Sequence, residues 1–252
     1  MTIRTDRDDH VLTITIDRPE AMNALAPEMM FQLEDAFIEL RDDAELRVAI
    51  VTGAGEKAFC AGADLGRMAD QGTRADTRRL KLFSGLDVMK PVVGAINGHC
   101  LAGGLGLALL CDVRIASENA TFGCMGTARG ILPGAGQTAR LPQVVGLGNA
   151  MWLLLSAERI PAEEALRIGL VNRLVPRGDA LRAAREWADI LASRAPMAVK
   201  ATKESALRGQ ALETTAALRL EGELAAPLMS SEDAQEGIRA FNEKRAPAWK
   251  GR

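Results

Sequence analysis

The amino-acid sequence predicts an α/β fold, and two observations carry this prediction. Three short β-rich runs, Val11 to Ile16, Arg47 to Gly53 and Val92 to Ile96, are each followed by turn residues and then by a helical pattern. The third run leads into the stretch NGHCLAGGLGLALLCD, Asn97 to Asp112, which reads as a glycine-rich turn followed by an apolar helix. Strands that alternate with helices in this way are typical of α/β proteins.

The remaining elements follow from residue spacing. Pro27 to Leu40 places Met29, Leu33 and Phe37 on one face of an amphipathic helix that we expect to cover a sheet. A further strand is predicted at Asp112 to Ser117. Gly66 to Arg79 is polar and rich in both charges, which predicts a surface loop leading into a helix. From about Ser193 onward the pattern is nearly all helical.

Composition narrows the function classes. The 252 residues suffice for one compact unit with a substantial core, and 31 basic against 33 acidic residues give no reason to expect nucleic acid or an anionic membrane as partner. No apolar run is long enough for a membrane span. The four cysteines lie singly without CxxC spacing, which argues against a zinc site and a disulfide framework. We therefore expect a cytoplasmic protein with reduced thiols.

Several motifs occur together in one order. They are IDRPEAMNAL (Ile16 to Leu25), FCAGADL (Phe59 to Leu65), the Asn97 to Asp112 stretch, GILPGAGQTARLP (Gly130 to Pro142) and SAERIPAEEALRIGLVNRLV (Ser156 to Val175). Over most of its length the chain thus resembles the enoyl-CoA hydratase/isomerase, or crotonase, superfamily. The resemblance implies a spiral of β-β-α units over residues 1–192, and a helical region over 193–252 that forms trimers and closes the acyl pocket.

The same resemblance implies a ligand and an assembly. The expected partner is an acyl-CoA thioester, with coenzyme A as part of the substrate and with no separate cofactor and no metal. The expected assembly is a homotrimer or a hexamer made of two trimers. By position, the backbone N–H groups of Ala63 and Gly103 form an oxyanion hole for the thioester oxygen, and loss of one such donor typically costs about two to three orders of magnitude in rate.

Coenzyme A contacts are carried over onto the residues around the first of these donors. Asp64 has a second reading as the N-cap of the following helix, which we favour. Arg18 and Lys57 are candidates for the phosphates of coenzyme A, although such side chains are usually only solvated. The carried-over contact residues are Ala61, Ala63, Asp64, Leu65, Gly66 and Gly103.

The acids of a standard hydratase are missing. Family hydratases use two glutamates to activate water and relay a proton, and in an ungapped alignment these positions fall on Gly106 and Gly126. Gly134 stands where other members carry an aspartate. Because glycine costs about 1 kcal/mol of helix propensity relative to alanine, its presence at position 106 suggests that the site needs open space there. We therefore hypothesise a pocket for a bulkier, cyclic or branched acyl group.

Few other proton carriers remain. His99 lies just before Gly103, and an unperturbed histidine titrates near pH 6.5, although its ring could instead point away from the pocket. For Cys100 and Cys124 we favour buried structural thiols over nucleophiles. Other candidates for contact with the acyl group or for completing the site are Arg129, Gln137, Asp70, Asp76 and, from a neighbouring subunit, Lys244 or Lys250.

These residues favour an enzyme that stabilises a thioester enolate or oxyanion, a lyase, isomerase or hydrolase, over an efficient hydratase. Two alternatives stay open. One is a non-catalytic acyl-CoA binding protein, and the other is a weak enoyl-CoA hydratase. A surviving proton carrier in the pocket would separate an enzyme from a binder.

Overall fold

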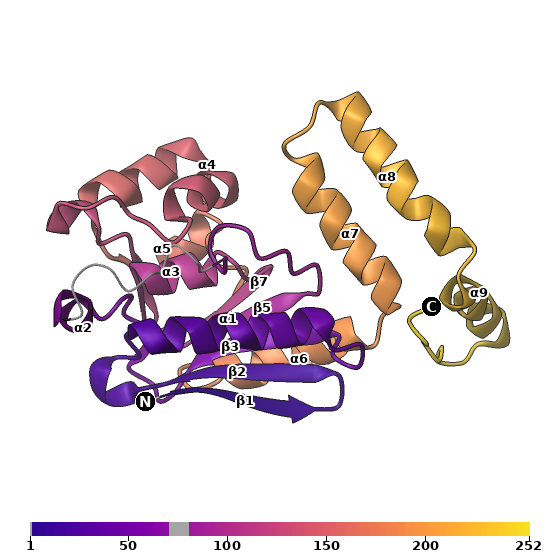
Figure 1. Cartoon of the computed structure of the whole chain (residues 1–252), viewed down its shortest axis with the longest axis horizontal. Coiled ribbons are helices and arrows are strands. Elements are labelled where there is room, and N and C mark those ends of the chain that lie inside the picture. Colours follow the sequence, from indigo (N-terminus) through magenta and orange to yellow (C-terminus); the bar gives the residue numbers. More distant parts are fainter. Residues whose placement is uncertain (1, 71–80) are drawn as a thin grey trace.

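The computed structural model describes residues 2–70 and 81–252, which fold around two sheets (Figure 1). The larger sheet has the strand order β1-β2-β3-β5-β7-β10. Its strands are β1 (Thr2–Asp8), β2 (Val11–Asp17), β3 (Val48–Gly53), β5 (Val92–Ile96), β7 (Val113–Ser117) and β10 (Arg173–Val175). Only β1 and β2 pair antiparallel; the other neighbours in this sheet are parallel.

The smaller sheet has the order β4-β6-β8-β9, with β4 (Ala58–Cys60), β6 (His99–Leu101), β8 (Thr121–Gly123) and β9 (Ile160–Pro161). Each of the pairs β3/β4, β5/β6 and β7/β8 therefore gives one strand to each sheet. Helices α2 (Leu65–Asp70), α3 (Gly103–Ala108) and α4 (Gln137–Ser156) follow these pairs in turn, α4 after the short 3-10 turn η3 (Thr127–Arg129). This arrangement is the predicted spiral of β-β-α units, and a flat doubly wound sheet is excluded.

The inner strands of the larger sheet are buried, with α1 (Pro27–Asp42) over one face and α6 (Ala180–Ala192) over the other (Figure 1). Alternate residues of β3 divide between two core clusters: Val48 and Ile50 pack with the α6 side, while Ala49 and Val51 pack with the opposite side. A strand buried on both faces needs apolar residues at every position, which explains the continuous apolar run in the sequence.

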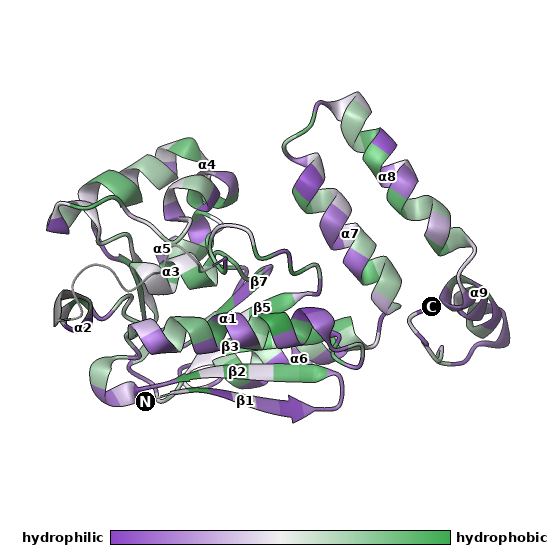
Figure 2. Cartoon of the chain, in the orientation of Figure 1, coloured by the Kyte–Doolittle hydropathy of each residue, from purple (hydrophilic) through white to green (hydrophobic). Residues whose placement is uncertain are grey.

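The edge strand β1 was not predicted. It pairs with β2 through a tight hairpin in which Asp8 lies opposite Val11 and Asp9 takes a φ of 53°. Its residues TIRTDRD are mostly exposed and largely hydrophilic (Figure 2), so they carry neither an apolar run nor an apolar alternation. Such a strand is specified by its partner rather than by its own pattern.

The polar segment predicted as a loop from Gly66 begins instead as helix α2, which extends to Asp70. The rest of that prediction, residues 71–79 with Asp76, lies outside the described residues. The first helix, predicted to reach Leu40, ends at Asp42, and the strand expected from Asp112 begins at Val113. The glycine-rich turn expected after Ile96 contains the short strand β6 before α3 begins at Gly103.

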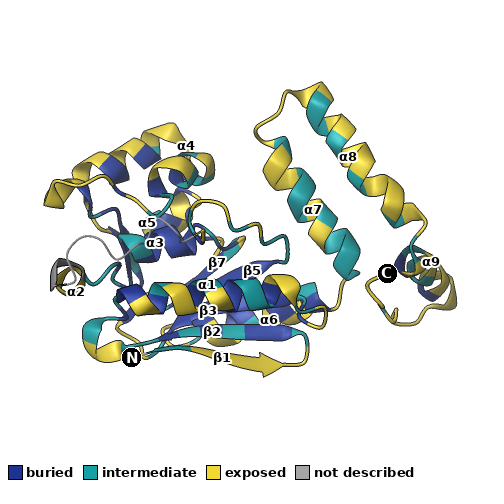
Figure 3. Cartoon of the chain, in the orientation of Figure 1, coloured by how far each residue is buried: buried dark blue, intermediate teal, exposed yellow. Residues whose placement is uncertain are grey.

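Helices α7 (Pro196–Gly209), α8 (Thr214–Met229) and α9 (Glu232–Glu243) follow α6 and stand away from the sheets (Figure 1). Most of their residues are exposed or half-buried (Figure 3), including Leu218, Met229, Ile238 and Phe241. The C-terminal segment is fixed by a hydrogen bond from the Trp249 indole N–H to the Ser193 carbonyl, 2.8 Å. Within the described residues, no helix is both long and apolar enough to cross a membrane.

Candidate active site

The backbone N–H of Ala63 points away from Leu25, the residue with which Ala63 pairs. Leu25 and Ala63 form an isolated parallel bridge, in which the Leu25 N–H donates to Gly62 and the Asp64 N–H donates to Leu25, at 2.8 and 2.9 Å. In a parallel bridge the central residue's own N–H points to the opposite side. In the described part of the chain, no group accepts a hydrogen bond from the Ala63 N–H.

Gly103 supplies a second N–H beside the first. It is the first residue of α3, where N–H groups have no partner within the helix, and among the described residues none accepts from it. A Cβ built on Gly103 would lie 3.5 Å from the Ala63 nitrogen, and one built on Gly62 would lie 3.1 Å from the Gly103 nitrogen. The two predicted donors are therefore neighbours, brought together by the pairing of Cys60 with Cys100 on β4 and β6.

Both turns beside these donors are conformationally demanding. Gly62 has a φ of 103°, and a Cβ there would lie 2.8 Å from the Ala102 Cβ, so glycine is required. Ala102 takes φ 49° and ψ −121°, a region that alanine rarely adopts. It is held there because its N–H donates to Gly123 and its carbonyl accepts from Gly106, at 2.9 and 3.1 Å. This backbone strain lies directly before the Gly103 N–H.

The Asp64 carboxylate caps α2, as the sequence reading favoured. Its Oδ1 accepts from the Arg67 N–H at 3.2 Å, and its Oδ2 accepts from Arg18 Nη1 at 2.6 Å. These hydrogen bonds, first the one from Arg18, lower the pKa of Asp64. The Arg18 guanidinium also donates to the Ala24 carbonyl, and its side chain is only 14% exposed. Arg18 is thus committed within the chain, whereas Lys57 is exposed.

Ala61, Leu65 and Gly66 flank the Ala63 N–H on its own segment. The Ala61 N–H donates to the Met22 carbonyl at 3.0 Å, which fixes the backbone after β4. Leu65 and Gly66 open α2 and are both exposed, Leu65 by 48%. Apart from Gly103, the predicted coenzyme A residues therefore lie on one short, partly exposed segment that carries the Ala63 N–H.

The space expected at Gly106 is not there. A Cβ on Gly106 would lie 2.5 Å from the carbonyl oxygen of Ala135 and 2.6 Å from its Cβ. At Gly126 a Cβ would lie 2.7 Å from the Pro133 nitrogen and 2.8 Å from the Ile131 oxygen. Since the 131–135 backbone closes onto both glycines, the expectation of free space at Gly106 was wrong. Glycine serves close backbone packing here.

His99 lies at the other end of β6. It is the register partner of Ala58 and Thr121, whereas Gly103 follows the far end of the strand beside Gly62, on the order of 10 Å along the chain direction. Its Nδ1 is 2.7 Å from the Thr121 hydroxyl oxygen. The structure therefore brings Ala63 and Gly103 together but leaves His99 apart from them.

The four cysteines are buried and unpaired with one another. Burial raises the pKa of the Cys60, Cys111 and Cys124 thiols to about 12, and raises that of Cys100 as well. The Cys60 sulfur accepts from the Gly62 N–H at 3.4 Å, a structural contact beneath the donor pair. Because the thiolate is the nucleophilic form, these thiols are poor nucleophiles at neutral pH.

The remaining candidates lie in different places. Arg129 is exposed on η3 and donates to the Met125 carbonyl, while Gln137 is buried and donates from Nε2 to the Gly134 carbonyl at 2.8 Å. The Asp70 side chain lies outside the described residues. Lys244 ends α9 in a left-handed conformation, and Lys250 pairs with Glu232 at 3.1 Å.

Sequence reasoning missed Arg140. Its guanidinium is half-buried and donates from both Nη atoms to the Phe83 carbonyl, at 3.2 Å each. A signal was present, because Arg129 and Arg140 are the only charged residues between Asn119 and Ala157, a stretch without any acid to pair with them. A cation without a local counter-charge is a candidate binding group.

The chain was compared with known proteins. A family model described as enoyl-CoA hydratase/isomerase matches residues 6–252. The chain is 41% identical over 246 residues to a short-chain-enoyl-CoA hydratase of Clostridium acetobutylicum, covering 95% of this chain and 94% of that protein. It is 39% identical over 255 residues to an (E)-benzylidenesuccinyl-CoA hydratase of Thauera aromatica, with 100% of both covered.

A solved structure gives the same result. The crystal structure of an enoyl-CoA hydratase from Mycobacterium tuberculosis H37Rv superimposes with a TM-score of 0.94 at 37% identity, covering 99% of both chains. The β-β-α spiral, the family model and these relatives agree over nearly the whole chain. The chain therefore belongs to the enoyl-CoA hydratase/isomerase family, with its crotonase fold and its place in acyl-CoA metabolism.

Proposed function

We propose that the chain binds an acyl-CoA thioester with the thioester oxygen between the N–H groups of Ala63 and Gly103. The observation that carries this proposal is the adjacency of these two N–H groups, neither of which donates to any described residue. Two preorganised donors in this position stabilise the negative charge of an enolate or a tetrahedral oxyanion. Family membership supplies the thioester as the ligand class.

Coenzyme A is placed along the segment that carries the first donor. Ala61, Ala63, Asp64, Leu65 and Gly66 would contact it through backbone groups, because the Asp64 carboxylate is already used by Arg18 and Arg67. Lys57 is the exposed cation that we assign to the phosphates in place of Arg18. No cofactor beyond coenzyme A as part of the substrate is proposed.

The proposed reaction is not standard hydration. A hydratase needs groups that carry protons to adjacent carbons, and neither Gly106 nor Gly126 has a side chain. The 131–135 backbone lies directly against both glycines, so a side chain at either position would meet main-chain atoms. Isomerisation, decarboxylation and hydrolysis remain, since each depends on the enolate or oxyanion site.

Crotonyl-CoA tests the absence of efficient hydration. We expect purified protein to leave the enoyl absorbance essentially unchanged. Turnover on the order of 10 per second or more, a typical enzyme rate, would overturn this part of the proposal. The same preparation should bind crotonyl-CoA, so a thermal shift without turnover is the expected combined result.

A proline at Gly103 tests the donor itself. Gly103→Pro removes the N–H at the first position of a helix, where proline is tolerated. We expect the variant to fold and to lose about two to three orders of magnitude in any thioester turnover. Thr214→Pro is the control for a proline at the first position of a helix, because Thr214 also begins a helix, the distant α8. Equal effects from both variants would contradict the assignment.

A non-catalytic acyl-CoA binding protein is the second candidate. Among the described residues, the nearest neighbours of Gly62, Gly103 and Gly104 are backbone atoms and the side chains of Ala102 and Cys60, and burial raises the pKa of the Cys60 thiol to about 12. A panel of acyl-CoAs that all raise the melting temperature, with no product by mass spectrometry, would favour this candidate over the enzyme.

For the assembly, we propose that residues 1–192 form the core and that 193–252 join chains into a homotrimer or a hexamer of two trimers. Support comes from the apolar residues that α8 and α9 expose, such as Met229 at 76% and Phe241 at 83%. Light scattering on Phe241→Asp should show a smaller assembly than on the wild type. We place the protein in the cytoplasm, since its four cysteines are free thiols.

A further inference from the structure

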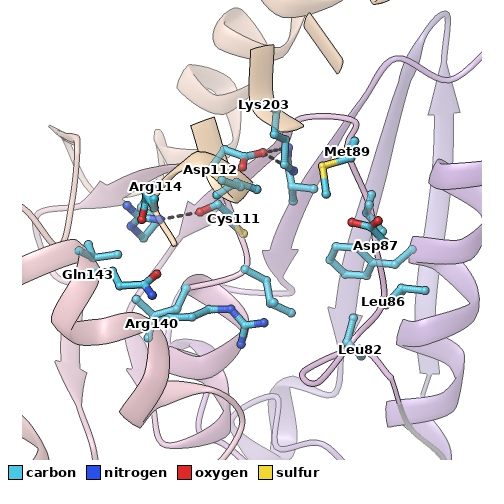
Figure 4. Close-up of a pocket in the computed structure, with 18 residues that line it drawn as sticks. Leu82, Leu86, Asp87, Met89, Cys111, Asp112, Arg114, Arg140, Gln143 and Lys203 are labelled. Carbon is cyan, nitrogen blue, oxygen red and sulfur yellow. Dashed lines mark hydrogen bonds and ion pairs between the residues drawn. The ribbon is translucent and has the colours of Figure 1, made fainter. Parts of the chain in front are cut away.

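A cavity of about 360 Å³ lies at the end of α3 opposite to Gly103 (Figure 4). Residues distant in sequence line it, from α1, the 82–89 segment, the end of α3, α4 and α7. Most of this lining is apolar, including Phe37, Leu82, Leu109 and Val144. A cavity with an apolar wall and a few polar groups is typical of sites for small organic ligands.

The charges that line this cavity do not balance. Asp112 is paired with Lys203 at 2.8 Å, and Asp87 is paired with Arg208 at 2.7 Å. Arg114 and Arg140 also line the cavity, and within the described part of the chain neither forms an ion pair with a carboxylate. Among the described residues, both guanidinium groups therefore remain without an ion-pair partner.

The two unpaired arginines differ in what their N–H groups do. Arg114 is 6% exposed and donates to the carbonyls of Leu170 and Cys111 at 2.7 and 2.6 Å. Among the described residues, Arg140 donates to the Phe83 carbonyl alone, through both Nη atoms. Figure 4 shows the Arg140 side chain reaching from α4 toward the segment that carries Leu82 and Leu86. A guanidinium has five N–H donors, so Arg140 keeps donors for a ligand.

The cavity lies at the opposite end of α3 from the proposed thioester site. Leu109, the C-cap of α3, follows Gly103 by six positions, which corresponds to about 9 Å at 1.5 Å per residue. Between these ends, the Ala135 backbone packs on Gly106, and the next residue, Gly136, lies against the Arg140 guanidinium. The Ala135–Gly136 backbone therefore lies between the Arg140 guanidinium and Gly106, the position of the family's first glutamate.

We propose that this cavity binds a carboxylate carried on an apolar body, with Arg140 as the group that recognises it. The carboxylate matches the fork of the guanidinium, and the apolar body matches the lining. Its source is the far end of an acyl group whose thioester lies at Ala63 and Gly103, that is, a dicarboxylic acyl-CoA. The assignment of that source rests on the proposed function, whereas recognition of a free carboxylic acid would not require it.

Affinity measurements with matched ligands test this inference. Suberyl-CoA and octanoyl-CoA have the same chain length and differ in the terminal carboxylate, and free suberate distinguishes an acid from a thioester. Titration calorimetry at fixed salt should show that Arg140→Met weakens suberyl-CoA binding by about 10- to 100-fold and leaves octanoyl-CoA within about 3-fold. Arg129→Met is the control, because Arg129 also donates to a backbone carbonyl but lies outside the cavity.

A second variant covers the case in which Arg140→Met fails to fold. Leu207 lines the cavity and is 48% exposed, so Leu207→Glu adds a negative charge there without touching Arg140. It should weaken suberyl-CoA about 10-fold or more and spare octanoyl-CoA, by repulsion between like charges. Equal losses for both ligands in both variants, or no loss in either, would overturn the inference.

The outcomes separate this inference from the proposed function. If octanoyl-CoA binds but suberyl-CoA shows no dependence on Arg140, only the carboxylate site is refuted. If no thioester binds while free suberate binds in an Arg140-dependent way, the carboxylate site stands and the thioester proposal falls. If neither thioesters nor suberate bind, both fall.

Discussion

Gly106 and Gly148 are both helical glycines, yet a methyl group added to each meets different surroundings. A Cβ on Gly106 would lie 2.5 Å from the Ala135 oxygen, whereas one on Gly148 would find nothing within 4 Å. At either position, alanine adds about 1 kcal/mol of helix propensity. At Gly106 this gain is opposed by forced contacts, which typically cost about 1–3 kcal/mol in a packed interior.

Gly148→Ala should therefore stabilise the chain by up to about 1 kcal/mol, and Gly106→Ala should destabilise it by up to about 2 kcal/mol. The difference corresponds to roughly 3–10 °C between the two melting temperatures for a chain of this size. Urea and thermal unfolding followed by tryptophan fluorescence measure it, at one protein concentration because assembly would also shift the transition. A Gly106→Ala variant as stable as Gly148→Ala would refute the claim that the Ala135 backbone fills this space.

Four further outcomes follow from the site. Ala102→Gly should raise the free energy of unfolding in urea by about 1 kcal/mol. Glycine relieves a backbone strain of about 1–3 kcal/mol, and its greater freedom in the unfolded chain offsets part of that gain. At pH 8 the four native thiols should not react with a thiol reagent and should all react in denaturant, since burial raises the pKa of Cys60 to about 12; rapid native labelling would contradict this burial. His99→Ala should lower kcat on any substrate by less than about 100-fold, because the imidazole bonds to Thr121 away from Gly103; a larger loss would identify it as a proton carrier. Asp64→Asn should cost stability at neutral pH and nothing at low pH. The Arg18 hydrogen bond lowers the folded pKa of Asp64, so its contribution is present above the unfolded value of about 4 and is lost as the pH falls through the folded pKa; a pH-independent difference in melting temperature would disprove the linkage.

The donor pair could be predicted because it depends on local motifs. Ala63 and Gly103 each sit at a fixed offset in a short glycine-rich sequence, and the resemblance supplied the spiral that brings the two turns together. β1 could not be predicted, because an exposed edge strand such as Thr2–Asp8 carries no apolar pattern.

The surroundings of Gly106 and the cavity at Arg140 depend on contacts between distant segments. A glycine in a sequence is equally compatible with open space and with a backbone pressed against it, and only the position of Ala135 decides between them. The cavity is formed where α1, α3, α4 and α7 meet, so no window of sequence contains it. The sequence shows that the stretch around Arg140, Asn119 to Ala157, contains no acid. What this implies for Arg140 depends on the side chains that distant segments place around it.

The two N–H groups that we propose hold the thioester oxygen belong to the main chain of successive turns of the spiral, whereas the acids of a hydratase would be side chains. A point mutation replaces a side chain, but every residue except proline keeps the main-chain N–H. Proton chemistry can therefore be lost, or gained again in another form, one substitution at a time while the proposed thioester site persists. A lineage with this architecture can pass through members that hold the ligand without transforming it, and each such member is a starting point from which a new reaction can evolve.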